Sequence, residues 1–135
     1  MCKTAILRAL FDNPTVQTVE AGGIIQLPDV TSNECCQAPV TGGVVSIRRD
    51  GTYEVHFNAT LVATVAGPVE VQMYRNGTPV PGAHALGTAA AVGDNVPLSF
   101  TALTTVDCCC AQSIDFRCID ATTVRVANVT LEAVE

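Results

Sequence analysis

The chain has 135 residues, of which 48% are hydrophobic and only 4% aromatic, and its formal net charge is −6. This size fits one domain with a full hydrophobic core, and the acidic balance argues against a nucleic-acid surface, which needs clustered basic charge. Charged residues make up only 15% of the chain. A small monomer normally covers itself with charge, so we expect part of the apolar surface to be an interface.

The first 22 residues are predicted to form a connector outside the main domain. Ile6, Leu7, Leu10 and Phe11 share one helical face before Asp12-Asn13-Pro14, so a short helix and an extended arm both fit. Arg8 interrupts the apolar run, and no small-residue cleavage site of a secretory signal follows it. No segment approaches the roughly 18 apolar residues of a membrane span. We therefore expect residues 1–22 to dock on a neighbouring subunit and residues 23–135 to form the domain.

The rest of the chain predicts about eight strands separated by turn residues. The predicted strands are residues 24–27, 44–47, 52–65, 69–75, 78–86, 96–106, 112–119 and 123–134. Residues 29–43 are expected to be a loop, and the basic pair Arg48-Arg49 is expected to lie in a solvated turn rather than on a polyanion site. Turn signals at this spacing predict an all-β, antiparallel β-sandwich rather than alternating strands and helices.

Alternation within the strands predicts which side chains form the core. The residues expected to be buried are Tyr53, Val55, Phe57, Ala59, Leu61, Ala63, Val71, Met73, Leu98, Phe100 and Leu131. Asn76-Gly77 is the strongest hairpin signal in the chain, because both residues readily adopt the positive φ angles of a two-residue turn. Pro79 and Pro81 predict that the strand after this turn lies at a sheet edge or contains a bulge, since proline donates no ladder hydrogen bond.

Seven cysteines are the sharpest chemical signal in the sequence. They are Cys2, Cys35, Cys36, Cys108, Cys109, Cys110 and Cys118, and an odd number leaves at least one thiol unpaired within the chain. Contiguous cysteines do not fit the Cys-x-x-Cys knuckle of a structural zinc site. Disulfides between clusters or between subunits, with Cys2 as a candidate intersubunit thiol, are favoured over reduced thiols that act as small hydrophobic groups.

Two histidines complete the candidates for chemistry. His56 lies on the polar face of its predicted strand, and His84 follows Gly82-Ala83. No nucleophile elbow or paired carboxylates accompany them, so we expect no enzyme, no catalytic residue and no cofactor. A solvent-facing or interface histidine is the simpler interpretation of both. In a trimer, His56 near the axis could meet its two copies and bind a metal ion or an anion.

The order of turn and strand motifs resembles the jelly-roll heads of the tumour-necrosis-factor and complement-head superfamily. The resemblance covers residues 44–134 and rests on Gly51-Thr52-Tyr53-Glu54-Val55, Val71-Gln72-Met73-Tyr74-Arg75-Asn76-Gly77, Val80-Pro81-Gly82, Gly93-Asp94 before Leu98-Ser99-Phe100, and a last strand from Val124 to Leu131. The sequence is closest in style to bacterial and phage members. It departs from the family in its many cysteines and in the lack of a collagen-like Gly-X-Y stalk.

The resemblance implies a homotrimer that binds or builds surfaces rather than catalyses. We expect a structural protein of a particle surface, either a phage virion or a spore or cell-surface appendage, that contacts itself and other surface proteins. The alternative is a receptor- or glycan-binding head. The chain has only two Tyr, four Phe and no Trp, and carbohydrate sites favour aromatic platforms, so composition favours the structural role.

Overall fold

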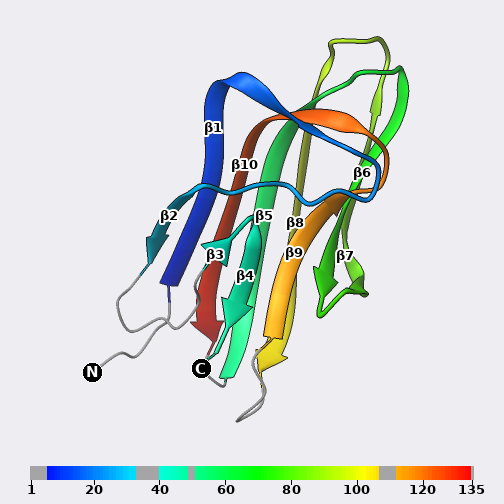
Figure 1. Ribbon diagram of the computed structural model, residues 1–135. Helices are drawn as coiled ribbons and strands as arrows, with labels where there is room; N and C mark the ends of the chain where they lie inside the picture. The colour runs from blue at the N-terminus through cyan, green and yellow to red at the C-terminus, as the bar shows by residue number, and fades with distance from the viewer. Residues whose placement is uncertain (1–5, 33–39, 49–50, 107–111, 135) are drawn as a thin grey trace.

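The computed structural model describes residues 6–32, 40–48, 51–106 and 112–134, which form an all-β sandwich of ten strands (Figure 1). Sheet I has the order β2-β1-β10-β5-β8 and sheet II the order β3-β4-β9-β6-β7, with antiparallel pairing throughout. Sheet I consists of β2 (Asp29–Ser32), β1 (Ile6–Val19), β10 (Thr122–Val134), β5 (Gly51–Val62) and β8 (Asn95–Val106). Sheet II consists of β3 (Val40–Thr41), β4 (Val44–Ile47), β9 (Gln112–Cys118), β6 (Gly67–Arg75) and β7 (Thr78–Ala89). The predicted sandwich is confirmed.

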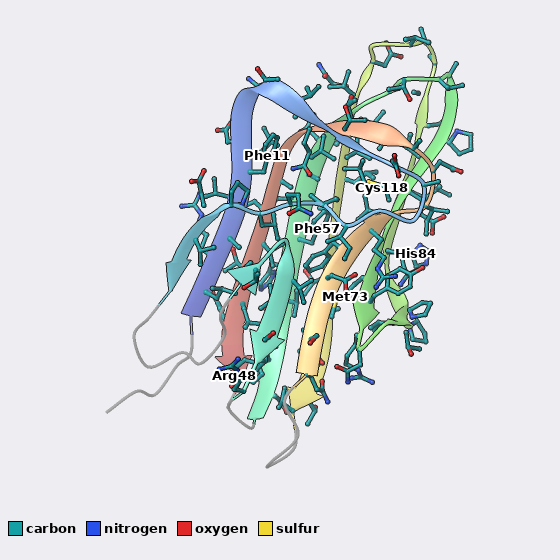
Figure 2. The ribbon with its side chains drawn as sticks, viewed as in Figure 1. Phe11, Arg48, Phe57, Met73, His84 and Cys118 are labelled. Carbon is teal, nitrogen blue, oxygen red and sulfur yellow. The ribbon has the colours of Figure 1, made fainter. Side chains whose placement is uncertain are left out.

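The core lies between the two sheets and follows the predicted alternation. The predicted core residues are buried, except that Phe100 is half-buried against the cluster. Phe57 on β5 stacks on Phe116 of β9 with ring centroids 4.7 Å apart, and on Phe100 of β8 at 5.2 Å. Figure 2 shows Phe57 and Met73 between the sheets. These rings join the two sheets at the centre of the core, which also buries Phe11, Tyr53 and Met73 among many aliphatic side chains.

The N-terminal segment is a strand, which agrees with the extended alternative and not with the short helix. β1 lies inside sheet I between β2 and β10, with Leu7, Ala9 and Phe11 buried in the core. Alternation through the small Ala9 is easily overlooked, because the larger apolar residues also fit a helical face. Pro14 falls in a register shift between Asp12 and Gln17 and does not end the strand. An arm outside the core is therefore wrong for residues 6–19, whereas docking on a neighbouring subunit stays a prediction.

The segment predicted as a loop at residues 29–43 contains two short strands. β2 pairs with β1, and β3 pairs with β4. The strand predicted at residues 24–27 is instead an extended crossing segment with one bridge, from Ile24 to Arg117, and it buries Ile25 and Leu27. The Gln17 side chain hydrogen-bonds both the backbone N–H and the carbonyl of Gln26, which ties this segment to β1. The segment thereby fills one side of the core.

The Asn76-Gly77 turn joins β6 to β7 as predicted. Both residues have positive φ, 52° and 81°, as a two-residue hairpin turn requires. β7 is the edge strand of sheet II, which confirms the prediction from its prolines. The register of β6 and β7 shifts between Gln72 and Tyr74, and the Gln72 amide donates hydrogen bonds to the carbonyls of Val80 and Ala83 there. These backbone carbonyls of the irregular edge strand thus receive hydrogen bonds from a side chain of the neighbouring strand.

Candidate functional site

The outer face of sheet I carries mainly uncharged polar side chains, together with the charged residues Arg8, Glu54 and Glu132. Outward-facing positions include Leu10 on β1, Asn128, Thr130 and Glu132 on β10, Glu54, His56, Asn58 and Thr60 on β5, and Pro97, Ser99, Thr101 and Leu103 on β8. The pairing of β10 with β5 sets Asn128 opposite Asn58, Thr130 opposite His56 and Glu132 opposite Glu54. The register of the strands therefore places residues from distant parts of the chain side by side across sheet I.

Asn128 lies in the middle of this face with an unsatisfied acceptor. Its Oδ1 atom is buried and has no hydrogen-bond partner within the described part of the chain. Its cross-strand neighbours are Leu10 on one side and Asn58 on the other. An unsatisfied buried acceptor costs about 1–3 kcal/mol, because it has lost water without gaining another donor. The described residues therefore leave this acceptor without a donor.

A shallow depression of about 510 Å³ borders Asn128 on the same face. The outward-facing side chains that line it are Asn58, Thr60, Pro97, Ser99 and Val126. No lining residue carries a charge, so desolvating this area costs less than covering a charged surface. The depression and the buried amide together make this face suitable for contact with another protein surface.

His56 and two glutamates form a cluster at one end of this face. His56 Nε2 lies 2.5 Å from Glu54 Oε1, and His56 Nδ1 lies 3.3 Å from the hydroxyl of Thr101 on β8. One carboxylate oxygen of Glu132 lies within 4.8 Å of the ligand atoms of both His56 and Glu54. The sequence pattern placed His56 on the same strand face as Glu54, but it did not indicate that Glu132 lies beside them. Contact between His56 and its own copies at a three-fold axis stays a prediction.

The outer face of sheet II, in contrast, satisfies its polar groups within the chain. Asp115 on β9 is only 5% exposed, and it accepts a hydrogen bond from Arg117 Nε at 2.7 Å. This hydrogen bond raises the pKa of the Arg117 guanidinium, and the opposing effect of burial is smaller. The guanidinium also lies over the Tyr74 ring, 4.2 Å from its centroid. Cation–π contact and ion pair together hold Arg117 in place.

The one cysteine within the described residues, Cys118, lies in the core. It is a free thiol with no exposed surface, and burial raises its pKa to about 12 (Figure 2). At neutral pH the thiol is uncharged, so it packs as a small hydrophobic group. This matches the reduced-thiol alternative for Cys118 and not the candidate disulfide. Cys2, Cys35, Cys36, Cys108, Cys109 and Cys110 lie outside the described residues.

Two other candidates from the sequence lie away from sheet I's outer face. His84 on β7 is exposed, and its Nδ1 lies 3.1 Å from Glu70 Oε2 on β6. Arg48 is exposed after β4, as expected of a solvated turn, whereas Arg49 and Asp50 lie outside the described residues. No metal-ligating group of three that includes His84 occurs in the part of the chain that the structure describes. His84 therefore belongs to a surface pair.

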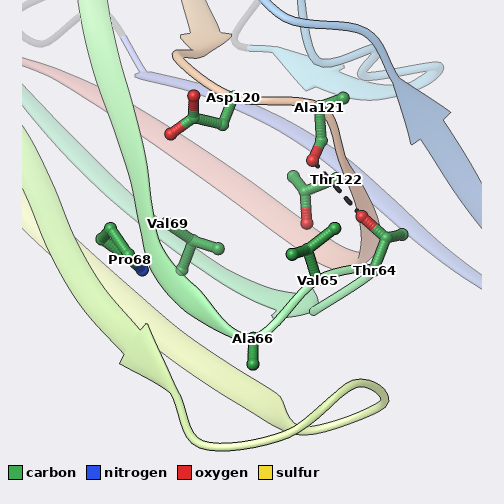
Figure 3. A pocket seen from close by; sticks show the side chains of 8 residues that line it. All are labelled: Thr64, Val65, Ala66, Pro68, Val69, Asp120, Ala121 and Thr122. Atoms are coloured by element: carbon green, nitrogen blue, oxygen red, sulfur yellow. Dashed lines mark hydrogen bonds between the residues drawn. The ribbon is translucent and has the colours of Figure 1, made fainter.

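A hollow of about 370 Å³ opens where the β5–β6 and β9–β10 connections meet (Figure 3). Its lining residues are Thr64, Val65, Ala66, Pro68, Val69, Asp120, Ala121 and Thr122. The Thr64 hydroxyl donates to the carbonyl of Ala121 at 3.4 Å, which links the two connections. Asp120 is the one ionisable group in the lining, and it is exposed. The hollow offers apolar contact and one carboxylate.

None of the described residues forms a helix that could cross a bilayer.

No protein-family model matches the sequence, and no curated protein matches it. Many solved structures match the chain, and the following three match nearly all of it at low sequence identity. The globular domain of zebrafish complement 1qA is 13% identical with a TM-score of 0.67, over 95% of this chain and 94% of that one.

The second structure is the tumour necrosis factor Eiger from S. frugiperda, 10% identical with a TM-score of 0.71, over 97% of this chain and 94% of that one. The third is murine APRIL at pH 5.0, 9% identical with a TM-score of 0.69, over 98% of this chain and 100% of that one. The likeness runs through β1 as well as the strands from residue 44 onward. The chain therefore has the jelly-roll fold of the complement 1q and tumour-necrosis-factor domains, as the resemblance in its turn motifs implied.

Proposed function

We propose that this chain is a non-enzymatic structural head that assembles as a homotrimer through the outer face of sheet I. The trimers would build the surface of a particle, either a phage virion or a spore or cell-surface appendage. This role follows the resemblance in the sequence, and the fold shared with complement 1q and tumour-necrosis-factor domains supports it. Other proteins of the same particle surface are the expected further partners.

The observation that carries the proposal is the buried amide of Asn128. Its acceptor is shielded from water by its own sheet, yet the described residues supply no donor. The uncharged depression beside it gives a second copy room to place a side chain near this acceptor. A donor from that copy would remove a cost of about 1–3 kcal/mol per chain, which favours the assembled state. The low fraction of charged residues in the chain agrees with a face that is covered in the assembly.

A receptor- or glycan-binding head is the second candidate, and the hollow in Figure 3 favours it. Val65 is 70% exposed at its rim, and exposed apolar side chains beside a carboxylate are typical of recognition loops. The hollow lacks an aromatic residue among those that line it, however. We therefore rank this function below the structural one.

Native mass spectrometry of the full chain tests the assembly. The wild-type protein should be a trimer or a multiple of three at micromolar concentration. Val126→Arg places a charge in the depression on sheet I, and it should yield folded monomers because the charge would be buried without a partner. Leu86→Arg is the matched control, since Leu86 is 63% exposed on sheet II and its replacement should leave the trimer intact.

Circular dichroism on both variants must show the wild-type β spectrum, so that a loss of assembly is not a loss of folding. A wild-type monomer at micromolar concentration would refute the proposal. Equal dissociation by Val126→Arg and Leu86→Arg would also refute it, because the contact would then not be specific to sheet I.

A further inference from the structure

We propose that Glu54, His56 and Glu132 together bind one divalent metal ion, either zinc or a neighbouring first-row transition metal. All three ligands come from one chain, and they lie at one end of the face that the proposed trimer uses. It differs from a site made by three copies of His56 at the trimer axis. It needs one His56 and the two glutamates that the pairing of β5 with β10 brings close to it.

The pairing of the two glutamates is the first observation behind this site. Glu54 and Glu132 occupy directly opposite positions on β5 and β10, on the outer face of sheet I. Like charges in directly opposite positions destabilise an antiparallel pair. In the described part of the chain, the ion pair made by these two carboxylates is the contact between Glu54 and His56. A bound cation between the two carboxylates would reverse this repulsion.

The orientation of His56 is the second observation. Its Nδ1 atom lies 3.3 Å from the Thr101 hydroxyl, and its Nε2 atom faces the carboxylate of Glu54. When Nδ1–H donates to Thr101, the lone pair of Nε2 points at Glu54 Oε1. A proton accounts for this 2.5 Å contact in the metal-free protein, and a bound metal ion would take the place of that proton. Metal-ligating histidines are commonly oriented by such a hydrogen bond on their other nitrogen.

The ligand set selects the class of metal. Calcium and magnesium prefer sites made of oxygen atoms, whereas an imidazole nitrogen with carboxylates suits zinc and its neighbours in the first transition row. Zinc bonds of roughly 2.0–2.2 Å in a tetrahedral site bring its ligand atoms to about 3.3 Å from one another. The three ligand atoms lie within 4.8 Å of one another. To reach the zinc spacing, His56 Nε2 and Glu54 Oε1 would move apart from their 2.5 Å contact, and the exposed Glu132 side chain would rotate towards them. A fourth position stays open for water.

The pair of His84 and Glu70 on sheet II provides a matched control. It has the same two residue types at 3.1 Å, and its side chains are exposed to a similar degree. No third ligand joins it among the residues that the structure describes. One histidine and one carboxylate bind zinc weakly, so the comparison isolates the contribution of Glu132 and the register.

Isothermal titration calorimetry with Zn²⁺ on the full chain tests the site. Accessible thiols are first capped with iodoacetamide, because thiolates bind zinc and would obscure the signal. We expect one Zn²⁺ per chain, with no displacement by excess Ca²⁺. His56→Ala and Glu132→Gln should each weaken binding about tenfold or more, and Thr101→Val should weaken it by a smaller factor. His84→Ala should change the affinity less than about twofold, as the control requires.

The proposal is wrong if Glu132→Gln binds Zn²⁺ as tightly as the wild-type protein, or if His84→Ala loses as much affinity as His56→Ala. Circular dichroism on each variant shows that it remains folded. Native mass spectrometry with and without a chelator separates this site from the proposed assembly. One zinc on a monomer would support the site and contradict the trimer, whereas a trimer without zinc would do the reverse.

Discussion

The two sheets of this sandwich share one core but differ in how they complete their outer faces. On sheet II, Asp115 is paired with Arg117, Arg117 lies over Tyr74, and the Gln72 amide satisfies carbonyls of β7. On sheet I, the Asn128 acceptor is buried without a partner in the described residues, and two glutamates face each other. The contrast teaches that polar residues on a strand differ in meaning. Those on sheet II complete the chain itself, whereas those on sheet I leave groups for something outside it.

The largest expected effect checks which side of sheet I is the inner one. Phe57→Ala should destabilise the protein by about 3–5 kcal/mol, because it removes the ring between Phe100 and Phe116 and leaves a cavity. The neighbouring substitution Asn58→Ala, on the outer face, should change stability by no more than about 0.5 kcal/mol. Urea denaturation of both variants measures the difference. Similar midpoints for the two variants would mean that the faces of β5 are assigned the wrong way round.

A smaller effect should come from the completed face of sheet II. Asp115→Asn removes the charge that Arg117 contacts, and it should cost about 1.5–3 kcal/mol, as expected for a hydrogen bond between charged groups. Arg117→Lys should lose part of this, because lysine cannot reproduce the stacking on Tyr74. Thermal unfolding of each variant gives the values. An unchanged melting temperature for Asp115→Asn would show that the cluster contributes nothing to the monomer.

The smallest expected effect has the opposite sign and lies on sheet I. Asn128→Leu in the Val126→Arg background should stabilise the isolated chain by about 1 kcal/mol, since it removes an unsatisfied buried acceptor. In the otherwise wild-type chain, the same substitution should weaken the trimer, because the partner would lose its acceptor. Unfolding curves measure the first effect and native mass spectrometry the second. Destabilisation in the monomer background would mean that Asn128 is already satisfied within one chain.

Much of the sandwich could be predicted because its signals are local. The Asn76-Gly77 turn and the alternation in β5 depend on neighbouring residues, and the structure confirms both. For β1 the sequence leaves a helix and an extended segment open, because its apolar residues fit both periodicities. Only pairing with β10 decides between them. The Glu54, His56 and Glu132 cluster could not be predicted from local signals, since it depends on the register between β5 and β10. Sequence patterns predict faces, but long-range pairing decides which residues meet on them.

The burial of Cys118 changes the arithmetic of the thiols. Of the seven cysteines in the chain, the free thiol of Cys118 accounts for one and leaves six. Six is an even number, so the odd count no longer requires a bond between chains or a second lone thiol. Cys118 is shielded from oxidants and alkylating reagents, because its thiol is buried and uncharged. The odd number of cysteines is thus compatible with one reduced thiol packed in the core.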